Sequence, residues 1–149
     1  MSVPVLQSLL ADFATVIGAL GLTGSPNVVV RKGAKKEPGV DPAGQVTIAQ
    51  SPKPEQYKKI AFGHMAVGYE IEVTQVAANN DDWSSNLNTY AANRQAVERA
   101  FGPPYSTPLL PTAPGVWNLE IVPDEFLNRG DMAENIDRWV VKVVVWIAY

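Results

Sequence analysis

Residues 81–101, DDWSSNLNTYAANRQAVERAF, decide the fold of this chain. Their apolar side chains recur at steps of three, four and seven residues, at Trp83, Leu87, Tyr90, Val97 and Phe101. This spacing follows the α-helical period of about 3.6 residues, so these side chains share one face of a helix. Because that face must be buried against another element, the pattern predicts a helix that lies on a β-sheet.

The ends of this helix are also marked in the sequence. Asp81 and Asp82 can accept hydrogen bonds from the free N–H groups of the first turn, where the helix dipole favours negative charge. Gly102 is expected to end the helix in a left-handed conformation, and the two prolines that follow cannot continue it. The face opposite the apolar stripe is polar: Ser85, Asn86, Asn93, Gln95 and Arg99.

The composition predicts one globular domain spanning residues 1–149, with 46% hydrophobic and 18% charged residues. There is no cysteine, which excludes a disulfide framework, a thiolate metal site and a cysteine nucleophile. No apolar run reaches the length of about 18 residues that a membrane-spanning helix needs, so no membrane association is expected. The first residues, MSVPVLQSLLADF, lack the basic segment of a signal peptide, so we expect folding in the cytoplasm.

Periodicity predicts a second helix over residues 5–20 and several strands. The apolar face of this helix comprises Leu6, Leu9, Leu10, Phe13, Ile17 and Leu20. The expected strands are residues 27–32, 45–50, 58–74, 116–122 and 138–149, and Gly63 and Gly68 are expected to mark a bulge or bend in the long one. Residues 33–44 read as a flexible arm and residues 102–115, with five prolines, as a surface loop.

The last strand, RWVVKVVVWIAY (residues 138–149), is apolar on both sides. A strand in an antiparallel sheet with helices on one face needs only one apolar side. Two explanations stay open. The second side is covered by the chain's own Pro-rich loop and arm, or it meets another subunit.

Strands that follow one another without helical crossovers predict a mostly antiparallel sheet. The expected fold is therefore α+β, a two-layer sandwich with a sheet of four to five strands and two helices packed on one face.

The sequence gives little support for catalysis, and we expect neither an enzyme nor a cofactor. His64 is the only histidine, so neither a histidine metal cluster nor a Ser–His–Asp arrangement with a spare ligand is available. Glu70 and Glu72 share a strand face at a spacing that paired carboxylates use, but charged residues alternating with apolar ones are typical of an exposed strand. No glycine-rich phosphate loop is present.

Charge is distributed unevenly along the chain, although the net charge is only −3. Residues 31–59 contain seven basic side chains, whereas acidic ones predominate after residue 117. Either the two segments are complementary contact surfaces between copies of the chain, or both are ordinary solvated loops.

The order of elements resembles that of the tail terminator and head–tail joining proteins of tailed bacteriophages. The segments that carry the resemblance are NVVVRKG (27–33), QVTIAQ (45–50), GYEIEVTQVAANNDDWSSNLNTYAANRQAVERAF (68–101), VWNLEIV (116–122) and DRWVVKVVVWIAY (137–149). The resemblance is one of pattern over nearly the whole chain, and the Pro-rich segment is longer than in the pattern.

This resemblance implies a structural virion protein, assembled in the host cytoplasm, that forms a ring of usually six copies. Such a ring ends the tail tube, joins it to the head connector and lets DNA pass as cargo. Candidate contacts between subunits are Arg31, Lys32, Lys35, Lys36, Val144, Trp146, Asp124, Glu125, Asp131 and Glu134. Glu70 and Glu72 are candidates to face the bore, where acidic side chains would not retain DNA.

Two other functions stay open. One is a head-completion or adaptor protein on the capsid side of the same joint. The other is a small α+β enzyme with a pocket on the sheet around His64, Tyr69, Glu70 and Glu72.

Overall fold

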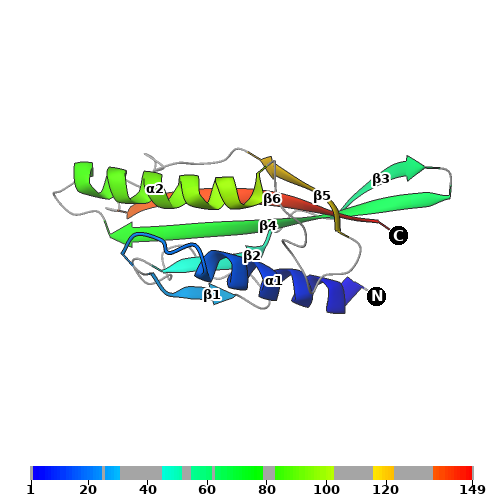
Figure 1. Ribbon diagram of the computed structural model, residues 1–149, viewed down its shortest axis with the longest axis horizontal. Helices are drawn as coiled ribbons and strands as arrows, with labels where there is room; N and C mark the ends of the chain where they lie inside the picture. The colour runs from blue at the N-terminus through cyan, green and yellow to red at the C-terminus, as the bar shows by residue number, and fades with distance from the viewer. Residues whose placement is uncertain are drawn as a thin grey trace.

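A computed structural model describes residues 2–24, 26–30, 45–51, 55–61, 63–78, 83–102, 116–122 and 136–148. Two helices and six strands follow one another along the chain (Figure 1). They are α1 (Ser2–Gly18), β1 (Val28–Val30), β2 (Val46–Gln50), β3 (Gln56–Ala61), β4 (His64–Ala78), α2 (Trp83–Phe101), β5 (Val116–Val122) and β6 (Ile136–Ala148). The predicted arm at residues 33–44 and the Pro-rich segment after Gly102 lie outside the described residues.

The six strands form one sheet in the order β1-β2-β4-β6-β5, and β3 pairs with the first part of β4. All pairs are antiparallel except β1 with β2. The centre is the long β4–β6 ladder, which runs without a register shift from Ala66–Ala148 to Ala78–Ile136. The predicted α+β class with a mostly antiparallel sheet is confirmed, and the sheet has one strand more than the upper expectation.

The additional strand arises because the segment predicted as one long strand is a hairpin. The chain reverses between Ala61 and His64, which pair with each other, and Gly63 adopts a φ of 76° in the turn. Glycine adopts this left-handed conformation at little cost, whereas other residues are strained there. Gly63 thus marks a reversal rather than a bend, and the only register shift of this pair lies between Lys59 and Ala61.

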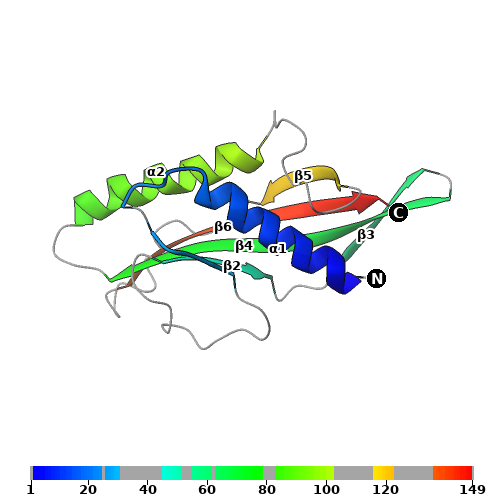
Figure 2. The ribbon, with the colours of Figure 1, turned by 60° about the horizontal axis from the view of Figure 1, so that its bottom comes forward.

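The core lies between the helices and one face of the sheet (Figure 2). Alternate residues of β4 from Val67 to Val73 and of β6 from Trp139 to Ile147 point into it, as the alternation in the sequence predicts. Phe13 of α1 stacks on Phe101 of α2 with ring centroids 4.4 Å apart, which joins the two helices. The buried members include Leu9, Phe13, Ile17, Val46, Ile48, Val67, Tyr69, Ile71, Val73, Val97, Phe101, Trp139, Val141, Val143 and Val145.

α2 ends at Phe101, as expected, but the physical reason for the glycine that follows is different. Gly102 is not left-handed. A Cβ at this position would lie 2.8 Å from the carbonyl oxygen of Glu98, which accepts a hydrogen bond from the Gly102 N–H. Glycine is needed there for close backbone packing. The proposed capping residues Asp81 and Asp82 lie outside the described part of the chain.

Asn93, which the sequence assigned to the polar face of α2, is buried. Its amide exchanges two hydrogen bonds with the backbone of Thr23, at 2.8 and 3.2 Å. It also donates to Oε1 of Gln75 at 3.1 Å, and Nε1 of Trp139 donates to the same oxygen at 3.0 Å. This network ties the loop after α1 to α2, β4 and β6. A sequence signal existed, because Asn93 is three residues after Tyr90 and four before Val97, in line with the buried stripe.

Candidate assembly surface

The sheet has a second, smaller apolar cluster on the face opposite the helices. It comprises Ala66, Val144 and Trp146, with Val122 packed against them. Val144 is 2% exposed and Trp146 is 5% exposed within the single chain. In the single chain these two side chains therefore offer almost no surface to a neighbour, and their expected role as a subunit contact stays a prediction. On the second side of β6, Val140, Val144 and Trp146 are buried within the single chain. The Pro-rich loop and the arm, which were expected to cover this side, lie outside the described residues.

Trp146 is held in this cluster by two neighbours. Gly68 is its cross-strand partner, and a Cβ on Gly68 would lie 3.0 Å from Cζ3 of the indole. Lys58 of β3 places its ammonium nitrogen 5.6 Å from the centre of the ring, a distance at which a cation is attracted to an aromatic face. The indole therefore connects β6, β4 and the β3–β4 hairpin.

The acidic residues expected to face a bore lie on this same face of the sheet but do not form an exposed pair. Glu70 is 6% exposed, so it is not a surface carboxylate of the single chain. Glu72 is half-buried and forms an ion pair with Lys142 of β6, with 3.7 Å between Nζ and Oε1. The charge of Glu72 is offset by its partner. That either residue faces a bore stays a prediction from the sequence.

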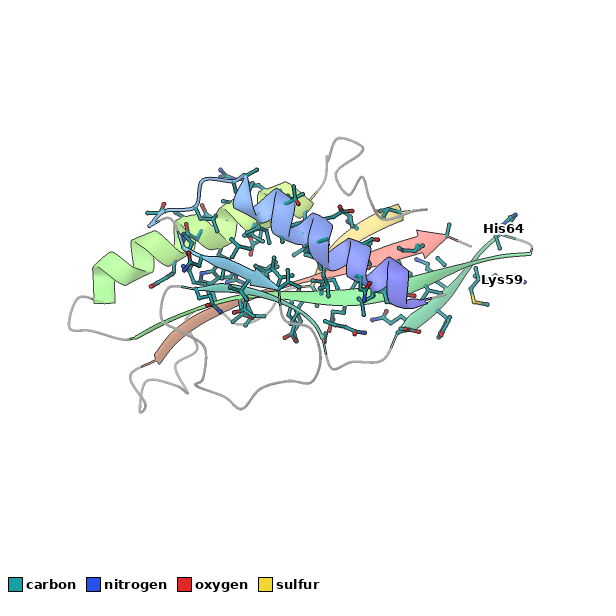
Figure 3. The ribbon with its side chains drawn as sticks, turned by 90° about the horizontal axis from the view of Figure 1, so that it is seen from below. Lys59 and His64 are labelled. Atoms are coloured by element: carbon teal, nitrogen blue, oxygen red, sulfur yellow. The ribbon has the colours of Figure 1, made fainter. Side chains whose placement is uncertain are left out.

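The β3–β4 hairpin projects from the rest of the described chain and carries exposed side chains. Its outer part extends past both helices and past the end of β6 (Figures 1 and 2). Tyr57 is 65% exposed and Met65 is 48% exposed, and these are two of the three exposed large hydrophobic side chains among the described residues. Lys59 and His64 are also exposed and lie near the tip (Figure 3).

The two faces of the hairpin follow from its register. Tyr57 pairs with Val67, and Lys59 pairs with Met65. Val67 points into the core, so Tyr57, Lys59 and Met65 lie on the side of the sheet that the helices cover farther along. Here neither helix covers it (Figure 2). We call these three residues the hairpin patch.

The hairpin was missed because its turn carries a weak signal. Two-residue hairpin loops are usually recognised by Asn-Gly or Asp-Gly, whereas Phe62 precedes the glycine here. Alternation alone does not distinguish one long strand from two short ones. The available signal was Gly63 flanked by two alternating segments.

No metal centre is found among the described residues. No group of three or more potential metal ligands occurs in the described part of the chain. His64 is on the hairpin surface, as expected for a structural or surface residue. It is six positions from Glu70 along β4, so it is not gathered with Glu70 and Glu72 into the cluster that an enzyme site on the sheet would need.

The remaining interface candidates fall outside the described residues. They are Arg31, Lys32, Lys35, Lys36, Asp124, Glu125, Asp131 and Glu134. Their proposed roles as complementary charges stay predictions from the sequence.

Comparison with known protein families and with curated proteins found no match. Within the described residues, none of the helices has the length and apolar character needed to cross a membrane.

Proposed function

We propose that this chain is a structural subunit that assembles with further copies into a closed ring, at the joint between the tail and the head of a tailed bacteriophage. The ring ends the tail tube, contacts the tube protein and the head connector, and lets DNA pass. The element order supports this proposal, together with a projecting hairpin that carries exposed apolar and basic side chains.

The observation that carries the proposal is the hairpin patch. Tyr57 and Met65 are large, apolar and mostly outside the core, on an arm that extends beyond the body of the subunit. Exposed apolar side chains on an arm gain free energy when a second molecule covers them, at about 25 cal/mol per Å² of apolar surface. Tyrosine and methionine are also enriched at protein interfaces.

The contact surface in this proposal is therefore the hairpin rather than Val144 and Trp146, which are buried in the single chain. A closed ring needs two different surfaces on each subunit, one that fits the other. The hairpin supplies one of them, and we assign the second to β5, at the opposite edge of the described sheet.

Light scattering after size-exclusion chromatography tests the proposal. The wild-type chain should have the mass of a closed oligomer, and the double variant Tyr57→Ser/Met65→Ser should shift towards monomer. Val29→Ser is the matched control, because Val29 is the third exposed large hydrophobic residue described and lies on β1, away from the hairpin. A wild-type chain that stays monomeric, or a double variant as oligomeric as the control, would count against the proposal.

Isolated phage components separate the two sides of the joint. A tail terminator is found on isolated tails, whereas a head-completion protein is found on isolated filled heads.

A further inference from the structure

We infer that neighbouring subunits join edge to edge, with β3 of one copy pairing with β5 of the next to extend the sheet across the interface. This inference rests on the proposed ring. Both strands have one partner among the described strands: β3 pairs with β4, and β5 pairs with β6. No other described strand lies on the outer side of either one, and the edge of a sheet is a template for pairing with another chain.

Strand directions make the pairing antiparallel. β3 runs antiparallel to β4, β4 to β6, and β6 to β5, so β3 and β5 of one subunit run in opposite directions. A neighbour added in the plane of the sheet with the same orientation then brings its β3 antiparallel to β5. This arrangement continues the antiparallel pattern of the sheet itself.

Charges match on the face opposite the helices. Lys58 pairs with Ala66, a member of the second apolar cluster, so Lys58 lies on that face. Glu120 pairs with Val144, another member, so Glu120 lies on the same face and is exposed. When β3 of a neighbour adds to β5, Lys58 and Glu120 fall on one side of the extended sheet. Opposite charges on adjacent strands stabilise pairing.

Apolar side chains match on the helix side of the sheet. Tyr57 alternates with Lys58 and therefore lies on the helix side, and it is the most exposed large hydrophobic residue described. On β5, Ile121 lies on this side and is half-buried, at the margin of the core. Pairing of the two edges brings the Tyr57 ring of one copy to this margin, so the main core continues across the interface.

A symmetric contact between two hairpins fits less well. It would bring Lys58 and Lys59 of one copy towards the same residues of the other, and like charges across a strand pair are unfavourable. Pairing of two different edges is a head-to-tail contact, which is the type that closes into rings.

Disulfide trapping tests the contact directly, since the chain has no cysteine of its own. Lys58→Cys is combined in turn with Asn118→Cys, Glu120→Cys or Val122→Cys, which share one face of β5 and sample the register. At least one double variant should form a reducible ladder of covalent dimers, trimers and larger species. Lys58→Cys alone should form no ladder.

The outcomes separate this contact from the ring itself. Oligomers that persist in light scattering while no double variant gives a ladder overturn the β3–β5 contact and leave the ring standing. Strong dimer formation by Lys58→Cys alone also overturns it, in favour of a symmetric hairpin contact. A chain that is monomeric under all conditions overturns both the contact and the proposed ring.

Charge exchange provides a second, independent readout. Lys58→Glu and Glu120→Lys should each weaken assembly by about tenfold, and the double variant should recover most of the loss, because the pair is restored with reversed signs. Arg99→Glu is the matched control, since it reverses the same charge at an exposed position of α2, outside both edge strands. If the double variant folds like the wild type but does not regain assembly, the pairing of these two residues is overturned.

Discussion

The indole of Trp146 in β6 lies directly against the backbone of Gly68, its partner across the central strand pair. A Cβ on Gly68 would come within 3.0 to 3.1 Å of three carbon atoms of the ring. This contact accounts for the close packing of the indole on the neighbouring strand. The large aromatic residue uses the space that a missing side chain leaves on the neighbouring strand.

Gly68→Ala is therefore expected to destabilise the chain by about 1–3 kcal/mol, because the indole must move out of a packed position. Gly18→Ala is the control: a Cβ there meets no atom within 4 Å, and Gly18 is in the last turn of α1. Its expected effect is neutral or stabilising, up to about 1 kcal/mol. Urea unfolding followed by circular dichroism measures both, and equal effects would contradict the packing described.

Trp146→Ala should cost about 3–5 kcal/mol of folding stability, as is typical when a buried aromatic side chain is removed. Trp146→Phe should recover much of that loss while keeping the ring over Gly68. Below its unfolding temperature, Trp146→Phe should assemble like the wild type, because Trp146 is buried within the subunit. Loss of assembly by a stably folded Trp146→Phe protein would mean that the indole contacts a neighbour after all.

Asn93→Ala should destabilise the fold by about 1–3 kcal/mol, since it removes the side-chain partner of the Thr23 backbone N–H and C=O and one of the two donors to Oε1 of Gln75. Gln95→Ala, two positions along the same helix and exposed, is the control and should change stability by less than about 0.5 kcal/mol. Thermal unfolding of the two variants side by side measures the difference. A stable Asn93→Ala protein would show that the network contributes little.

Gly63→Val should strain the hairpin turn by about 1–3 kcal/mol, because the φ of 76° is unfavourable for a β-branched residue. The hairpin projects from the body, so the cost should appear as faster amide hydrogen exchange in β3 with little change at Val141 or Val143 in the core. Gly63→Asn should be milder, since asparagine tolerates this conformation. Uniformly faster exchange throughout the sheet would contradict a locally independent hairpin.

The elements that could be predicted from the sequence are those with a long, regular period. The face of α1 that contains Leu9, Phe13 and Ile17 is buried, as its spacing predicts. The alternation of Tyr69, Ile71 and Val73 likewise places these residues in the core. When one period repeats over many residues, only one type of secondary structure places all the apolar side chains on the same face.

The features that could not be predicted depend on contacts between distant segments. The burial of Trp146 depends on Gly68, and the burial of Asn93 depends on Gln75 and Thr23. The pattern of a single strand or helix does not identify the segment that will cover it. The exposed hairpin was missed for a local reason, since its turn is marked by one glycine only.

Native mass spectrometry of the purified wild-type chain tests the central claim most directly. A subunit with two complementary edges should give one predominant oligomer with a fixed number of copies, and dilution should release monomers without an open series of intermediate sizes. Folded protein that is monomeric at every concentration, or that forms an open series with no preferred number, would contradict the ring.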